Sequence, residues 1–130
     1  MGDMIEFVAN GGTARGYLAV PETGSGAAVL VIQEWWGLAP QLMRVCDRLA
    51  EAGYVALAPD LYHGELAEHD EMDKASHLMT TLDMEHAAVE MSGAITALLA
   101  RPETTSSTAG VVGYCTVSYT HLTLPTIYSV

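Results

Sequence analysis

The sequence has few basic residues. Five Lys plus Arg stand against 16 Asp plus Glu, which gives a formal net charge of −11 over 130 residues. A protein with this charge repels both the phosphate backbone of nucleic acids and anionic membrane surfaces. No apolar run in the sequence approaches the roughly 20 residues that a membrane-spanning helix needs. We therefore expect neither a nucleic-acid partner nor a membrane partner.

Cysteine is also scarce. Cys46 and Cys115 are the two cysteines, and they lie far apart in a sequence whose first residues lack the basic and apolar segments of a secretory signal. A secreted disulfide scaffold is therefore not expected, and we predict a cytoplasmic protein. Half of the residues are apolar and 16% are charged, which suits one packed domain.

The pattern of apolar residues predicts an alternating α/β chain. Continuously apolar segments are typical of buried parallel strands, and segments with apolar residues at helical spacing separate them. Asp83 is a suitable N-cap for the longer helix. The acidic residues 65–73 are predicted to start a surface helix, and residues 104–108 to form a polar loop. The predicted strands are 4–8, 14–20, 27–32, 54–58 and 109–115, and the predicted helices are 41–52 and 83–100.

A candidate nucleophile stands at the end of the last predicted strand. Gly113-Tyr114-Cys115 matches the first half of a nucleophile elbow, a strained turn that exposes its central side chain. The backbone N–H of Thr116 and the N-terminus of a following helix would lower the pKa of the thiol and bind an oxyanion. Val117 replaces the second glycine of the motif. The alternative is a cysteine that ends a core strand.

A second candidate group follows the predicted central strand. Glu34, Trp35 and Trp36 occupy the loop after residues 27–32, where open α/β sheets place their ligands. A carboxylate beside a thiol can take its proton. The alternative is a solvated glutamate with two tryptophans that cap the core. Because no glycine-rich phosphate loop follows this strand, we do not expect a flavodoxin-like nucleotide binder.

Histidine and acidic residues are frequent between positions 63 and 86. His69, Asp73 and His77 follow one another at the i, i+4 spacing of a helix face, as metal ligands can. Acidic surface helices that contain histidine are common without a metal, and no cysteine or compact ligand motif accompanies these residues. We therefore expect a solvated face, with no metal and no cofactor. The candidates considered are His63, Glu65, Glu68, His69, Asp73, His77 and His86.

Four separated motifs carry a resemblance. They are VIQEWWG at 31–37, APDLY at 58–62, DME at 83–85 and GVVGYC at 110–115. In this order they resemble the landmarks of dienelactone hydrolases (carboxymethylenebutenolidases). The resemblance implies a three-layer α/β-hydrolase sandwich and a monomeric, cofactor-free enzyme that opens small-molecule esters or lactones with a Cys-His-Asp triad. It implies Cys115 as the nucleophile, Glu34 as the carboxylate that contacts its thiol, and the N–H groups of Trp35 and Thr116 as the oxyanion hole.

Two features depart from this family. Its members that act on dienelactone hold the substrate carboxylate with an Arg and a Tyr, where an ungapped count places Met72 and Ser76. The net charge of −11 also argues against an anionic substrate. In addition, the triad acid and histidine of the family follow the nucleophile. Here no Asp or Glu follows Glu103, and His121 is the only later histidine.

The C-terminal residues have a pattern of their own. Residues 117–126 resemble the translation of a sequencing adapter, so His121 is not taken as a triad base. We predict that residues 1–115 are the N-terminal part of a dienelactone-hydrolase-like domain, truncated after the nucleophile strand. Residues 116–130 are predicted to be a non-native tail, and the chain to be inactive. The alternative is a small non-catalytic α/β binding module whose tryptophan loop holds an apolar ligand.

Overall fold

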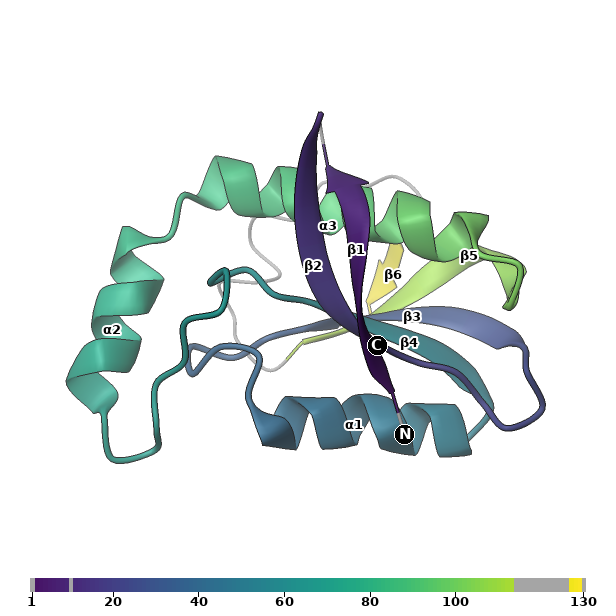
Figure 1. The fold of residues 1–130 in the computed structure, drawn as a ribbon, viewed down its shortest axis with the longest axis horizontal. Coiled ribbons are helices and arrows are strands. Elements are labelled where there is room, and N and C mark those ends of the chain that lie inside the picture. Colours follow the sequence, from purple (N-terminus) through teal and green to yellow (C-terminus); the bar gives the residue numbers. More distant parts are fainter. Residues whose placement is uncertain (1, 10, 114–126, 130) are drawn as a thin grey trace.

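A mixed sheet lies between two helices in the computed structural model, which describes residues 2–9, 11–113 and 127–129. The strand order is β1-β2-β4-β3-β5-β6. Helix α1 covers one face of the sheet and α3 the other, while α2 lies to one side (Figure 1). The strands are β1 (Asp3–Ala9), β2 (Gly12–Ala19), β3 (Gly26–Ile32), β4 (Tyr54–Pro59), β5 (Thr104–Gly113) and β6 (Ile127–Ser129), and the helices are α1 (Pro40–Glu51), α2 (Met72–Thr81) and α3 (Met84–Ala100).

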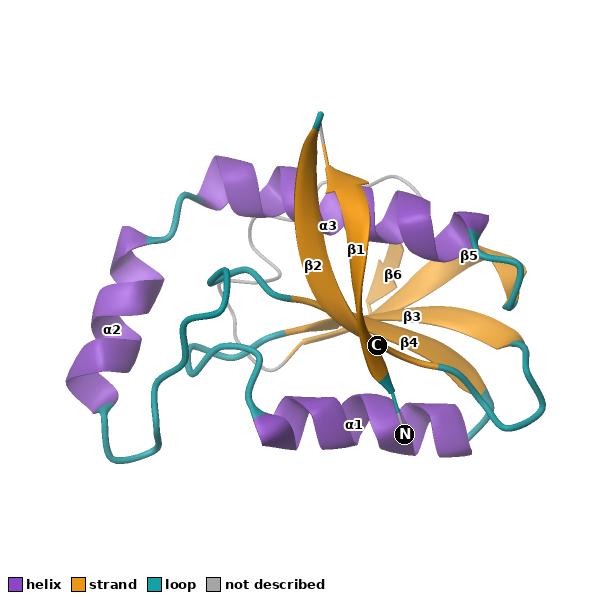
Figure 2. Cartoon of the chain, in the orientation of Figure 1, coloured by secondary structure: helices purple, strands orange, loops and turns teal. Residues whose placement is uncertain are grey.

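The central strands run parallel. β3 pairs in parallel with β4 on one side and with β5 on the other, while β1, β2 and β4 pair antiparallel. Parallel neighbours need a crossover connection, and α1 supplies it between β3 and β4. As a result, the C-terminal ends of β3, β4 and β5 meet at one edge of the sheet. Figure 2 shows the loops after β3 and β4 extending from this edge on the same side as α2.

Alternation along β3 divides the core into two layers. Leu30 and Ile32 pack with the buried face of α3, whereas Val29 and Val31 pack with that of α1. Because side chains alternate between the faces of a strand, a strand covered on both sides is apolar throughout. This is the reason that the predicted strand 27–32 is confirmed. The other predicted strands and both helices match within a few residues, although residues 114–115 lie outside the described residues.

The ends of the helices follow from their sequences. The Asp83 side chain accepts hydrogen bonds from the backbone N–H groups of Glu85 and His86, at 3.1 and 3.2 Å, and so caps α3 as predicted. α1 begins with Pro40 and is followed by Gly53 at φ 102°, a conformation that favours glycine after a helix.

One local prediction is wrong, and a second places the start of a helix too early. The polar residues 104–108 belong to β5, because the Ser106 hydroxyl accepts a 2.9 Å hydrogen bond from the Ala28 N–H and so extends the contact with β3. The acidic stretch is a loop up to Glu71, and α2 begins only at Met72. Here the Ala67 N–H donates to the Trp36 carbonyl at 2.9 Å, and this long-range bond replaces the start of a helix.

The predicted C-terminal tail is described only in part. Residues 127–129 form β6, which pairs in parallel with β5. Residues 114–126 and 130 lie outside the described residues, so the predicted division at residue 115 stays a prediction.

Close packing of α3 on β1 yields a test of the fold. A Cβ atom at Gly93 would lie 2.8 Å from the Val8 carbonyl oxygen and 2.9 Å from the Ala9 Cβ. Gly93→Val should therefore lower the free energy of unfolding by about 2 kcal/mol, as overpacking does. Thr96→Val, at an exposed position of the same helix, is the control and should change it by less than about 0.5 kcal/mol. Urea unfolding measures both, and an equal effect of the two substitutions would contradict this packing.

Candidate active site

The candidate site begins where β3 and β5 end side by side. Ile32 is the last residue of β3 and pairs with Gly113, the last residue of β5. Ligands of open α/β sheets bind at this carboxyl edge. The chain after Ile32 supplies Glu34 and Trp35. Cys115 and Thr116 follow Gly113 in the sequence, but they lie outside the described residues, so their roles stay predictions.

A tight turn presents Glu34 and Trp35. The Gly37 N–H donates to the Glu34 carbonyl at 3.1 Å, and Gly37 has φ 98°. A Cβ atom at Gly37 would also lie 2.7 Å from the Glu65 carbonyl oxygen, so the turn requires glycine for two reasons. Glu34 and Trp35 are half-buried. Among the described residues, none donates a hydrogen bond to the Glu34 carboxylate, and none accepts one from the backbone N–H of Trp35.

A buried amide holds this turn to the neighbouring strand. Gln33 is 4% exposed, and its Oε1 accepts a 2.9 Å hydrogen bond from the Leu61 N–H, just beyond the end of β4. Buried polar side chains keep such partners because an unpaired group is costly. Gln33 therefore positions the site, a role that the sequence reasoning missed. Its signal was a polar residue directly after a continuously apolar strand.

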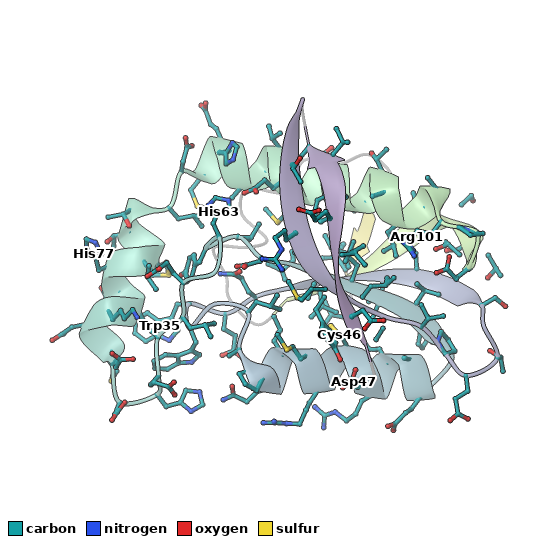
Figure 3. All side chains as sticks on the ribbon, viewed as in Figure 1. Trp35, Cys46, Asp47, His63, His77 and Arg101 are labelled. Atoms are coloured by element: carbon teal, nitrogen blue, oxygen red, sulfur yellow. The ribbon has the colours of Figure 1, made fainter. Side chains whose placement is uncertain are left out.

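The two tryptophans pack on the loop before α2. Their ring centroids are 5.2 Å apart, and the Trp36 ring lies 4.8 Å from the His69 ring in an edge-to-face arrangement. The Gln41 Nε2 lies 2.7 Å from the His69 Nε2. Figure 3 shows Trp35 on the side of the molecule where α2 lies. The loop after β3 thus packs against the loop before α2 through Trp36 and is not surrounded by solvent alone.

A small apolar cavity adjoins Glu34 and Trp35. Its volume is about 30 Å³, roughly that of one water molecule. Three methionines stand in its wall, and methionine is an unbranched, adaptable side chain that can make room for an acyl group. The lining residues are Gln33, Glu34, Trp35, Leu61, Tyr62, Met79, Leu82, Met84, Ala87 and Met91.

Cys46 is not a candidate nucleophile. It lies on the buried face of α1 and is fully enclosed in the core, and burial, with a smaller effect of the Asp47 charge, raises the pKa of its thiol to about 12. Because the thiolate is the reactive form, a buried thiol with this pKa is inert.

The histidines between positions 63 and 86 do not form the helix face that their spacing suggested. His77 lies on α2 and His69 packs against Trp36, and Figure 3 shows His77 and His63 well apart. His63 and His86 instead lie close to Glu90, a buried residue that the sequence reasoning did not consider.

The comparisons with known proteins decide the family. The family model described as the dienelactone hydrolase family matches residues 14–120. The chain belongs to the dienelactone hydrolase family. This confirms the resemblance drawn from the four motifs, and with it an α/β-hydrolase fold.

Two curated proteins are similar to this chain. Carboxymethylenebutenolidase of Pseudomonas sp. (strain P51) is 33% identical over 112 residues, which cover 81% of this chain and 47% of that protein. Protein usf of Aquifex pyrophilus is 40% identical over 121 residues, which cover 88% and 51%. The chain thus spans about half the length of these curated relatives.

A solved structure shares the fold. It is named "Putative Dienelactone Hydrolase from Klebsiella pneumoniae subsp. pneumoniae MGH 78578" and is 22% identical. The match has a TM-score of 0.83 and covers 99% of this chain and 57% of that one.

The helices of the described residues were also considered as membrane spans. None of them combines the length and the apolar character that crossing a lipid bilayer requires.

The inertness of Cys46 can be tested by thiol labelling. With a pKa of about 12, about one Cys46 thiol in ten thousand is ionised at pH 8. A Cys115→Ser variant should therefore react with a disulfide reagent such as DTNB only after denaturation. Cys46→Ala is the matched variant and isolates the labelling of Cys115. Rapid labelling of native Cys115→Ser protein would show that Cys46 is accessible and ionisable.

Proposed function

We propose that this chain carries the nucleophile half of a hydrolase that cleaves small-molecule esters or lactones through Cys115. The observations that support this most are the pairing of Ile32 with Gly113 at the ends of β3 and β5, and the turn after β3, whose Glu34 and Trp35 line an apolar cavity. Two residues span at most about 7 Å, so chain connectivity keeps Cys115 near Gly113. A cytoplasmic location, a monomeric state and the lack of a cofactor stay predictions.

The proposed first step is acyl transfer to sulfur. The Glu34 carboxylate accepts the thiol proton of Cys115, and the thiolate attacks the carbonyl carbon of the ester. The N–H groups of Trp35 and Thr116 donate to the oxyanion that forms. When the C–O bond breaks, the electron pair leaves with the alkoxide, and a thioester remains on Cys115.

The second step needs groups that this sequence does not supply. Hydrolysis of the thioester requires a base that activates water, and release of a poor leaving group requires an acid. The family has a histidine and an aspartate after its nucleophile, but no Asp or Glu follows Glu103 here. We therefore infer that the 130-residue chain forms an acyl-enzyme without turnover.

The cavity wall favours an uncharged acyl group. Most of its lining is apolar, including Met79, Leu82 and Met84, and the Glu34 carboxylate in the same wall disfavours a second negative charge. Met72 and Ser76, which stand where a family Arg and Tyr would hold an anionic substrate, are both exposed on α2. Asp73, in the first turn of α2, adds negative charge beside them. Dienelactone itself is therefore not the substrate that we propose.

Intact-protein mass spectrometry tests this proposal. On incubation with p-nitrophenyl acetate, the chain should gain one acetyl group on Cys115 and release one equivalent of nitrophenolate, without further turnover. An uncharged p-nitrophenyl ester should acylate Cys115 about tenfold faster than an anionic ester of similar length, because the site repels negative charge. Glu34→Gln should slow acylation, since the thiol loses its base.

Two variants serve as controls. Cys46→Ala should acylate as the wild-type chain does, and Cys115→Ser should not acylate. Acetylation at another residue, or sustained turnover that survives Cys115→Ser, would refute the proposal.

A further inference from the structure

We propose that His63, His86 and Glu90 form a binding site for a divalent transition-metal ion of the zinc class. The site shares no residue with the candidate active site, although the neighbouring Tyr62, Ala87 and Met91 line the cavity there, and the proposal does not rest on the proposed hydrolysis. His63 lies in the turn that follows β4, while His86 and Glu90 lie one helical turn apart on α3. Figure 3 shows His63 close to the first turns of α3.

The ligand atoms are spaced as a small metal ion requires. The His63 Nε2 lies 2.9 and 3.0 Å from the two Glu90 carboxylate oxygens, and the His86 Nε2 lies 3.7 Å from Glu90 Oε1. One ligand atom from each of the three residues falls within 4.8 Å of the others. Zinc bonds of about 2.0–2.2 Å at tetrahedral angles separate ligand atoms by roughly 3.3–3.6 Å. Small side-chain adjustments therefore suffice to bring all three onto one ion.

The donor set is that of an open metal site. Two histidines and a glutamate are a known combination for zinc, in which water completes the coordination. The His63 and His86 side chains are 57% and 56% exposed, whereas Glu90 is 4% exposed. Solvent thus reaches the imidazole side and provides both an entry path and the fourth ligand.

Burial of Glu90 supplies an independent reason for a cation. A buried carboxylate needs a compensating positive charge or hydrogen bonds. Ala87, Met91 and Ala94 flank Glu90 on the same helix and belong to the core. Among the described residues, only histidines are recorded as partners of the Glu90 side chain. A neutral imidazole does not neutralise the charge of the Glu90 carboxylate. A bound metal ion neutralises it without protonation of either imidazole ring.

The backbone of His63 is also unusual. His63 has φ 53° and is the one non-glycine residue with positive φ among residues 2–9, 11–113 and 127–129. The Gly64 N–H donates to Asp60 Oδ2 at 2.7 Å and holds the turn. Such strained conformations persist where the surrounding structure enforces them, often at functional sites. Here the turn directs the imidazole to Glu90.

The competing explanation is a simple ion pair. Protonated His63 paired with Glu90 accounts for the two short contacts, with His86 as a solvated neighbour. If the ion pair is the whole explanation, substitution of His86 does not change the affinity for metal. The effect of a His86 substitution therefore decides between the metal site and the ion pair.

Calorimetric titration of the untagged 130-residue chain with Zn²⁺ tests the site. We expect one ion per chain and a loss of affinity of at least about tenfold in His63→Gln and in His86→Gln, because each removes one of three ligands. Both substitutions replace exposed side chains, so the fold should be retained. His77→Gln is the matched control, and Cys115→Ser excludes a contribution from that thiol; both should bind as the wild-type chain does.

Co²⁺ absorption and thermal unfolding give second readouts. The wild-type chain, but not His86→Gln, should show the intense visible bands of four-coordinate Co²⁺. Zn²⁺ should raise the unfolding temperature of the wild-type chain and not that of His86→Gln, because a ligand stabilises only the state that binds it. Absence of saturable binding, or affinity that His63→Gln and His86→Gln leave unchanged, would overturn the proposal. Either result leaves the acylation test unaffected.

Discussion

The parallel pairing of β3 with β4 and β5 is the constraint on which the rest of the structure depends. It brings three strand ends to one edge of the sheet, and the residues that follow them therefore meet. Gln33 then fixes the geometry, since its hydrogen bond to the Leu61 N–H joins the loops after β3 and β4. Without this pairing, the Glu34 turn, the apolar cavity and the end of β5 at Gly113 would have no common location.

Much of this architecture could be predicted from the sequence because it depends on periodicity. The strand 27–32 is apolar throughout because α1 and α3 cover both of its faces. The Asp83 cap is a local interaction and was equally predictable. The strand conformation of the polar segment 104–108 could not be predicted in this way. It depends on the Ala28 N–H, which donates to the Ser106 hydroxyl and lies 78 residues away in sequence. Local polarity carries no information about such a partner.

The same distinction applies to the sites. Glu34 and Trp35 were predictable because loops after buried parallel strands form ligand sites. The positioning role of Gln33 and the grouping of His63 with His86 and Glu90 were not, because both depend on which segments the fold brings together. Helical spacing instead favoured His69, Asp73 and His77, and α2 begins too late in the chain for His69 to lie on it. Spacing identifies residues on one helix but not ligands from two elements.

The central claim is that the sheet edge brings Cys115 to Glu34, and intramolecular crosslinking tests it most directly. In a Cys46→Ala background, a Glu34→Cys variant should form a disulfide between positions 34 and 115 on mild oxidation, because only side chains in close reach can be bridged. Glu22→Cys, in the loop before β3 at the opposite end of that strand, is the control and should not form one. Peptide mapping under non-reducing conditions gives the answer. A 34–115 disulfide that forms in preference to a 22–115 disulfide is the predicted result, and failure of the 34–115 pair to form would contradict the account.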